Sequence, residues 1–215
     1  MSAITAYLQF YEKHPDYFKQ DDDLYVVTSE EALRQYAAQH ACQLGLIYET
    51  KYFWIVIDLL QNVAEERYPY MRMIHKERSN GVVIIPQYEG KIVFLNQFRH
   101  GSRQLELELP RGFAEKGLTV YENAAQEIAE EIGAKAENLQ LLGKIMSDSG
   151  LTSSPVSILL CDISSIGQLE HDEGIKDVTL LSKDEVLEAI ASDQIRDSFS
   201  ICAMMKWTLH TERSK

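Results

Sequence analysis

Three glutamates near the middle of the chain have the spacing of a cation-binding helix face. Glu127, Glu130 and Glu131 stand at i, i+3 and i+4, so a helix places them on one side. Their mutual repulsion is unfavourable unless a positive charge lies between them, and hard divalent cations prefer carboxylate oxygens. An acidic helix face alone is usually just solvated, with about a one-in-ten chance of binding metal. A glycine-containing loop from Gly112 leads into the helix, so the backbone can approach a ligand closely.

The stretch from Gly112 to Ala134 resembles the signature of the Nudix hydrolases. That signature is a glycine, five residues, a glutamate, seven residues, then Arg-Glu-aliphatic-x-Glu-Glu-x-Gly-aliphatic. The matching positions are Gly112, Glu127, Ile128, Glu130, Glu131 and Gly133. The resemblance implies that Glu127, Glu130 and Glu131 hold Mg²⁺, or alternatively Mn²⁺, beside a pyrophosphate. The backbone carbonyl of Arg111 is a possible further ligand in the same comparison.

Two positions depart from this signature. Leu118 stands where the loop glutamate is expected, and Gln126 stands where the arginine is expected. In the family these two residues are read as a charged pair that braces the loop against the helix. Losing one charge would leave the other unpaired, which is costly, whereas losing both is nearly neutral. Restoring glutamate at 118 alone is therefore expected to destabilise the protein, and restoring both charges to be tolerated.

The segments before the signature resemble Nudix enzymes that cleave nucleoside diphosphate sugars, such as ADP-ribose pyrophosphatases. These segments are Gln97-Phe98-Arg99-His100 and Leu107-Glu108-Leu109-Pro110-Arg111-Gly112-Phe113. Arg99 is expected to bind a substrate phosphate, because a guanidinium fits paired phosphate oxygens. Arg111 and Arg103 are weaker candidates for the same role. Glu108 is either an outer carboxylate of the substrate site or a solvent-facing strand residue.

Two later segments complete the resemblance. Gly150-Leu151-Thr152 resembles the loop that accepts the second half of the substrate, although Ser149 replaces a proline common in enzymes that cleave ADP-ribose. The acidic segment 170–176 resembles the loop that supplies the catalytic base, which must reach the attacking water. Glu173 matches the base position best and Glu170 second, with a solvated acidic loop as the alternative.

Alternating strand and helix patterns predict an α+β protein. With the resemblance, the expected architecture is a Nudix fold, a mixed sheet between helices (α/β/α), after an N-terminal helical and β extension. The expected parts are residues 1–50 (helical), 51–79 (β, a possible dimerisation element) and 80–215 (Nudix domain), with Ser79-Asn80-Gly81 as a boundary. Helices are predicted over 3–19, from a Thr28–Glu31 capping box to about 44, and over 121–132, 182–191 and 198–210. Strands are predicted over 52–60, 68–74, 82–86, 91–95, 105–109, 139–145, 156–162 and 178–181.

Composition limits the function classes. The formal net charge of −12 argues against non-specific nucleic-acid binding, but a bound cation would still permit an anionic substrate. Cys42, Cys161 and Cys202 have no metal-ligand spacing and are expected to be free thiols in a reducing compartment. No signal peptide or membrane span is recognised, so a cytoplasmic location is expected. By analogy with the subfamily, strands 52–77 are expected to form a homodimer.

The expected function is Mg²⁺-dependent hydrolysis of the pyrophosphate bond of a nucleoside diphosphate joined to another group, such as ADP-ribose or a nucleoside diphosphate sugar. The products would be a nucleoside monophosphate and a sugar phosphate. Glu131 would act with the metal, and Glu173 or Glu170 would take the proton of the attacking water. The alternative is a Nudix-like module that senses a nucleotide without cleaving it, which Leu118 and Gln126 favour and the intact glutamates oppose. A purely structural acidic protein would leave the glutamates and the Gly112 loop unexplained.

Overall fold

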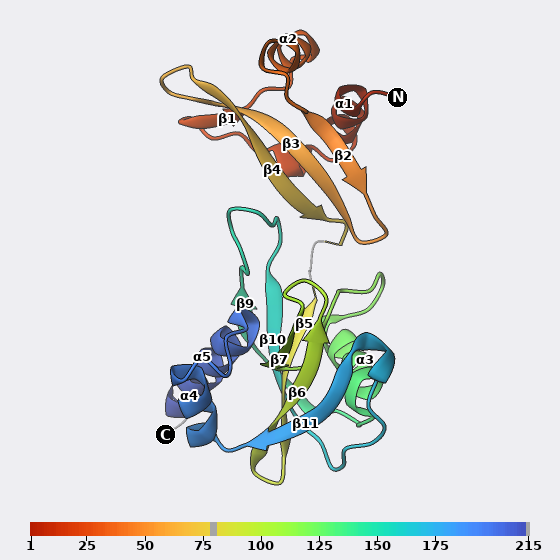
Figure 1. Cartoon of the computed structure of the whole chain (residues 1–215), viewed down its shortest axis with the longest axis vertical. Helices are drawn as coiled ribbons and strands as arrows, with labels where there is room; N and C mark the ends of the chain where they lie inside the picture. The colour runs from red at the N-terminus through yellow and green to blue at the C-terminus, as the bar shows by residue number, and fades with distance from the viewer. Residues whose placement is uncertain (78–80, 214–215) are drawn as a thin grey trace. The chain divides into compact units, whose positions relative to one another are not determined.

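The chain folds into two compact units. The computed structural model describes residues 1–77 and 81–213, with both termini and the course of the chain marked in Figure 1. Unit 1 comprises Met1–Arg78 together with Asp148–Ser154, and unit 2 comprises Ser79–Ser147 and Pro155–Lys215. Ser79 and Asn80 of the predicted boundary lie outside the described residues. Among the described helices, none is long and apolar enough to cross a membrane.

Unit 2 is built on a seven-stranded mixed sheet. Strand β5 pairs in parallel with β10, and the remaining pairings are antiparallel, in the order β11-β6-β5-β10-β9 with β7 beside β6 and β8 beside β5. The strands are β5 (Val82–Tyr88), β6 (Lys91–Arg99), β7 (Gln104–Glu108), β8 (Arg111–Gly112), β9 (Glu137–Ile145), β10 (Val156–Asp162) and β11 (Ile175–Leu181).

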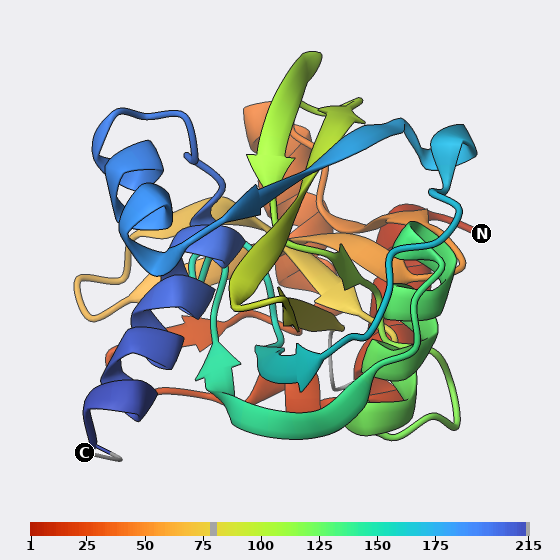
Figure 2. The same cartoon turned by 90° about the horizontal axis from the view of Figure 1, so that it is seen from below.

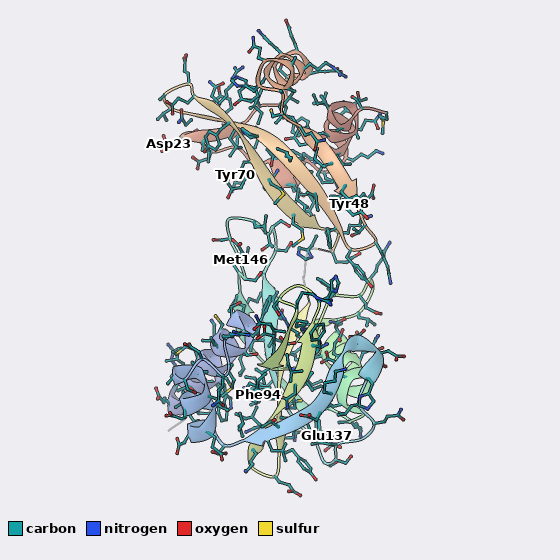
Figure 3. All side chains as sticks on the ribbon, in the orientation of Figure 1. Asp23, Tyr48, Tyr70, Phe94, Glu137 and Met146 are labelled. Carbon is teal, nitrogen blue, oxygen red and sulfur yellow. The ribbon has the colours of Figure 1, made fainter. Side chains whose placement is uncertain are left out.

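Helices cover both faces of this sheet. In Figures 1 and 2, α3 (Val120–Ile132) lies on one face, while α4 (Lys183–Ala191) and α5 (Ser198–Arg213) lie on the other. Alternate residues of β5 pack on opposite faces of the sheet, because successive side chains of a strand point in opposite directions. Val82 and Ile84 pack in the α3 core, whereas Val83 and Ile85 pack in the α4–α5 core. Phe94, labelled in Figure 3, lies in the second core. The predicted α/β/α layering around a mixed sheet is confirmed.

Strands β5 and β6 separate after a short paired region, and this fork positions the site. They pair at Gln87–Tyr88 with Lys91–Ile92, at the hairpin end. Farther along, β5 pairs with β8 and β6 pairs with β7. The chain from β7 to β8 therefore enters between the two diverging strands. It brings Glu108 and Arg111 into the middle of the sheet.

Unit 1 is an antiparallel sheet with helices packed against it. Strand β3 is central and pairs with β1, β2 and β4. Tyr7 donates a hydrogen bond of 2.5 Å to the fully buried Asp58, which also binds Arg72 at 2.5 Å. The elements are α1 (Ala3–Lys13), the 3₁₀ turn η1 (Pro15–Phe18), β1 (Leu24–Val26), α2 (Glu30–His40), β2 (Gly45–Glu49), β3 (Phe53–Asn62) and β4 (Arg67–His75). The predicted pairing of the 52–60 and 68–74 strands is confirmed.

Several predicted boundaries are wrong. The helix expected over 3–19 ends at Lys13, because Pro15 cannot continue it and instead opens the 3₁₀ turn. The second helix is capped by Ser29, not Thr28, and stops before Ala41, whose φ of 49° is left-handed. Residues 1–50 also contain β1 and β2, so this region is not purely helical. Strand β11 begins at Ile175, three residues earlier than predicted.

Candidate active site

Helix α3 is held in position at both ends and by contact with the preceding loop. Thr119 and Glu122 form a capping box at its start, and Gly133, with φ of 59°, ends it. The Glu127 carboxylate lies directly over Gly112, where any β-carbon would overlap it. A β-carbon at 112 would therefore displace the Glu127 carboxylate from this position. This contact places the loop before α3 against its acidic face.

Burial and neighbouring charge perturb two of the three signature glutamates. Glu131 is 2% exposed, and burial followed by the charge of Glu127 raises its pKa to about 8. Burial, followed by the charges of Glu130, Glu173 and Glu115, raises the pKa of Glu127 to about 7. The structure thus concentrates negative charge in a partly desolvated place. Such a place favours a cation or bound protons.

The third signature glutamate lies at the solvent-exposed side of the helix. Glu130 is exposed and accepts a hydrogen bond of 2.9 Å from Gln126 Nε2. Gln126, at the signature position where arginine was expected, therefore contacts a signature glutamate. Leu118, the other departure, is 37% exposed. A charge at 118 would have access to solvent, which lowers the expected cost of leaving it unpaired.

Two arginines converge on one buried carboxylate beside the glutamates. Glu108 is 1% exposed, so the alternative of a solvent-facing strand residue is wrong. Its carboxylate forms an ion pair with Arg99 and another with Arg111 at 3.0 Å. Burial raises the pKa of Glu108, while the charges of Arg111 and Arg99 oppose that rise. The Arg111 backbone N–H also donates to Glu131 at 3.1 Å, linking this cluster to α3.

Both guanidinium groups retain buried N–H atoms with no hydrogen-bond partner within the described parts of the chain. These atoms are Nη2 of Arg99 and Nε of Arg111. Leaving a charged N–H unpaired in a buried place is unfavourable. An anionic ligand with several oxygens would satisfy both groups. Arg103, by contrast, is exposed and packs over the Phe98 ring at 5.1 Å.

The two candidate bases have different surroundings. The charge of Glu173 raises the pKa of both Glu127 and Glu131, so Glu173 acts electrostatically on the acidic face. The Glu170 side chain instead accepts a hydrogen bond of 3.0 Å from the Asp172 backbone N–H and caps the turn η2 (His171–Glu173). Buried Gln97 on β6 holds this turn through a 3.0 Å bond to the Glu173 carbonyl.

Two residues near the acidic face, Asn123 and Glu115, were not predicted from the sequence. Asn123 is buried in the first turns of α3, where its side chain accepts from the Glu115 backbone N–H at 3.2 Å and donates to the Phe113 carbonyl at 3.2 Å. Glu115 is the third acidic residue, after Glu130 and Glu173, whose charge raises the pKa of Glu127. An asparagine near a helix start is a common cap, so its long-range role had no distinctive signal.

Gly150 belongs to unit 1, whereas the residues of the cluster described above belong to unit 2. Tyr70 donates a hydrogen bond to its carbonyl, and Met73 of β4 binds the neighbouring Leu151 carbonyl at 2.8 Å. The 148–154 loop thus extends the edge of the unit 1 sheet. Its expected role in substrate binding stays a prediction.

The acidic cluster fits a divalent cation in chemistry, although its ligands are not preassembled. Among residues 1–77 and 81–213, no three acidic, histidine or cysteine side chains already form a metal-holding group. Burial, followed by the charges of neighbouring glutamates, nevertheless raises the pKa values of Glu127 and Glu131, and a bound cation would oppose that rise. Carboxylate oxygens are the ligands that Mg²⁺ and Mn²⁺ prefer.

Comparison with known proteins identifies relatives with 27–29% sequence identity to this chain. The chain is 29% identical over 118 residues to the ADP compounds hydrolase NudE of Escherichia coli (strain K12), covering 54% of this chain and 62% of that protein. It is 27% identical over 131 residues to the ADP-ribose pyrophosphatase of Bacillus subtilis (strain 168), covering 59% and 70%. It is 29% identical over 126 residues to the methanol dehydrogenase activator of Bacillus methanolicus, covering 57% and 68%.

The fold and the family model agree with these relatives. A crystal structure of an ADP compounds hydrolase superposes with a TM-score of 0.67 at 20% identity, covering 80% of this chain and 93% of that one. This likeness shows the fold. The NUDIX domain model matches residues 76–199, more than half of the chain. The chain therefore belongs to the Nudix hydrolase family.

Proposed function

We propose that the protein is a Mg²⁺-dependent pyrophosphatase that hydrolyses ADP-ribose or a related nucleoside diphosphate sugar. The observation that carries this proposal is that an acidic cluster and two arginine side chains lie next to each other. Glu127, Glu131 and Glu173 concentrate negative charge. Arg99 and Arg111 beside them carry buried N–H groups that have no partner among residues 1–77 and 81–213. A metal pyrophosphate has the complementary pattern of a cation and several anionic oxygens.

In the proposed mechanism, Glu127, Glu130 and Glu131 hold the metal, with the Arg111 backbone carbonyl as a further ligand. Bound Mg²⁺, or Mn²⁺ in its place, would neutralise phosphate charge and acidify the attacking water. Arg99 and Arg111 bind phosphate oxygens through the N–H groups that have no partner in the described part of the chain, and Glu108 fixes both guanidiniums. Orientation by paired donors lowers the entropic cost of reaching the reactive geometry.

Glu173 is the proposed general base. Its charge acts on both Glu127 and Glu131, whereas the Glu170 carboxylate is occupied by its own turn. A base must lie near the water whose proton it removes. Gln97 supports this assignment, because it fixes the Glu173 backbone from the buried side of β6. The products would be AMP, or another nucleoside monophosphate, and a sugar phosphate.

The relatives support the substrate class. Two of them are named for ADP compounds or ADP-ribose, and the sequence before the signature resembles enzymes of that kind. The sensing-module alternative rested on Leu118 and Gln126. It loses support, because the loop brace is supplied by Asn123 and Gln126 contacts Glu130 instead.

We also propose that the protein is a cytoplasmic homodimer formed through unit 1. Strand β4 carries the exposed apolar side chains Tyr68, Tyr70 and Met71, which a second copy would cover. The three cysteines are free thiols, consistent with a reducing compartment. Light scattering coupled to size exclusion tests the dimer, with Met71→Asp expected to shift it toward monomer.

A substrate panel tests the enzymatic proposal. ADP-ribose, ADP-glucose, UDP-glucose, NADH and diadenosine polyphosphates are incubated with Mg²⁺ or with EDTA, and the products are identified by chromatography. We expect Mg²⁺-dependent release of a nucleoside monophosphate from at least one substrate. Glu131→Gln, which is nearly isosteric, should abolish most of that turnover while remaining folded. Calorimetric binding of ADP-ribose with no turnover of any substrate would instead establish the sensing module.

A further inference from the structure

The first turn of helix α5 is capped by a carboxylate that has one oxygen to spare. Asp197 accepts the Ser200 backbone N–H and the Ser200 hydroxyl through the same atom, Oδ2, each at 2.8 Å. Its backbone carbonyl accepts the Ile201 N–H at 3.1 Å, so Asp197 is the N-cap of the helix. The other carboxylate oxygen, Oδ1, is left for an interaction outside α5.

This capped turn is fastened to the segment that enters the fork between β5 and β6. The Ser200 hydroxyl accepts the Leu109 backbone N–H at 2.9 Å, and both residues are fully buried. A buried backbone N–H without a partner is costly, so this bond fixes the path of the chain at Leu109. The next residues along that path are Pro110 and Arg111. The start of α5 therefore sets where the Arg111 backbone lies.

The same turn also holds the Arg111 side chain. Asp197 Oδ1 lies 3.6 Å from Arg111 Nη2, and the guanidinium carbon lies 4.6 Å from the centre of the Phe199 ring. Glu108 binds the same guanidinium but is shared with Arg99. Because the Glu108 carboxylate binds two guanidiniums, it restrains each of them less than it would restrain one alone. Asp197 and Phe199 supply the second and third contacts that hold Arg111.

These contacts leave one buried nitrogen of Arg111 unsatisfied. They use Nη2 and the ring-facing surface of the guanidinium, while Nε has no hydrogen-bond partner among the described residues. Arg99 likewise keeps Nη2 without a partner there. A side chain held on three sides with one N–H left over is arranged to present that N–H to a ligand.

We propose that Asp197 is a positioning residue that, together with Phe199, fixes the Arg111 guanidinium for binding the substrate pyrophosphate. The inference rests on the proposed function for its substrate. It assigns a role in that reaction to the C-terminal helix, far in sequence from the signature. Asp197 itself is not proposed to touch the substrate.

Asp197→Asn is the decisive variant. Asparagine caps helices as well as aspartate does, and its oxygen retains both bonds to Ser200, so the melting temperature should stay nearly unchanged. The charge facing Arg111 is removed. We expect KM for the hydrolysed substrate to rise about 3- to 10-fold, as for loss of a partly buried ion pair, with kcat within about twofold. Phe199→Leu should raise KM in the same direction and provides a second variant if Asp197→Asn folds poorly.

Two controls separate positioning from stability. In an Arg111→Met background, Asp197→Asn should no longer change KM, because the group that it positions is gone. Ser182→Ala removes the cap of α4 and should lower the melting temperature without changing KM. An unchanged or lowered KM in folded Asp197→Asn would overturn the inference. So would an equal rise in KM in the Arg111→Met background.

A binding measurement keeps this inference distinct from the proposed function. If the wild-type protein hydrolyses no substrate, the proposed function fails. Calorimetric titration with inorganic pyrophosphate and Mg²⁺ then tests the positioning role by itself. Binding weakened several-fold by Asp197→Asn supports it, while equal binding by both proteins, or none by either, rejects it.

Discussion

The buried side chain of Asn123 ties helix α3 to the loop that precedes it, accepting the Glu115 backbone N–H and donating to the Phe113 carbonyl, each at 3.2 Å. This amide does the work that the family signature assigns to a charged pair. A neutral bridge to the backbone involves no ionic desolvation, so it is compatible with Leu118 and Gln126 at the usual positions of the charges. The loop is braced without them.

Removing this bridge should therefore cost stability and activity together. Asn123→Ala removes both hydrogen bonds of this bridge, and we expect a loss of about 1–3 kcal/mol in the free energy of unfolding, measured by urea denaturation. Gln126→Ala on the same helix is the control, with an expected change within about 0.5 kcal/mol. Equal stability of wild type and Asn123→Ala would show that the brace lies elsewhere.

Restoring the family's charges should have little effect. Leu118 is 37% exposed, so glutamate there would stay solvated, and Leu118→Glu alone should change the free energy of unfolding by less than about 0.5 kcal/mol. The double variant with Gln126→Arg should behave similarly. This outcome replaces the sequence-based expectation that the single change destabilises. Loss of stability in the single variant with recovery in the double would reinstate the charged brace.

These residues illustrate which features of the fold and the site could be predicted from the sequence and which could not. Gly112, the glutamates and the β-rich pattern from Val82 onward identified the fold, because each is fixed by local spacing or a steric need. Asn123 was missed because its partners depend on how the loop turns, which spacing does not encode. Strands β1 and β2 were missed for a similar reason, since short strands form only when β3 is present to pair with them.

The burial of Glu108 beside Arg99 and Arg111 likewise could not be read from the sequence. Alternation of Leu and Glu along β7 is typical of a half-buried strand, so a solvent-facing Glu108 was one of the two alternatives that the sequence left open. The chain instead enters the fork between β5 and β6, where Glu108 is enclosed by Arg99 and Arg111. The alternation of residues within one strand does not reveal whether neighbouring parts of the same sheet bury one of its faces. The role of Asp197 is a consequence of the same enclosure.

Enlarging Gly112 should damage the metal-binding face selectively. A β-carbon there would overlap the Glu127 carboxylate, while the backbone at 112 is outside the left-handed region and tolerates alanine. Gly112→Ala should therefore displace Glu127 and lower metal affinity or activity roughly 10- to 100-fold, as for disturbed support of a metal ligand. Gly101→Ala, where a β-carbon would meet no atom within 4 Å, is the matched control. Similar Mg²⁺ titrations for the two variants would contradict this reading.

The raised carboxyl pKa values predict a pH-dependent stability in EDTA. Glu127 and Glu131 have pKa values of about 7 and 8 in the folded protein, above their usual values, so folding takes up protons between about pH 4.5 and 8. Their contribution to stability is complete below that range and is lost as pH rises through it. His75 acts in the opposite sense, because burial lowers its pKa.

The comparison of wild type with Glu131→Gln isolates this effect. In EDTA, the melting temperature of wild type should fall relative to that of the variant between pH 5 and pH 8. Mg²⁺ should raise the wild-type melting temperature more at pH 8 than at pH 6, since the cation replaces the protons. A parallel pH dependence of the two proteins would refute the assignment of uncompensated charge to Glu131.

The two candidate bases are separable by isosteric substitution. Glu173→Gln removes a charge that acts on Glu127 and Glu131, and we expect kcat to fall about 10²- to 10⁴-fold, as for loss of a general base. Glu170→Gln keeps the oxygen that caps η2, so kcat should stay within about threefold. If Glu170→Gln is the slower enzyme and melts like wild type, the base is Glu170, and the coupling of Glu173 to the acidic face is electrostatic only.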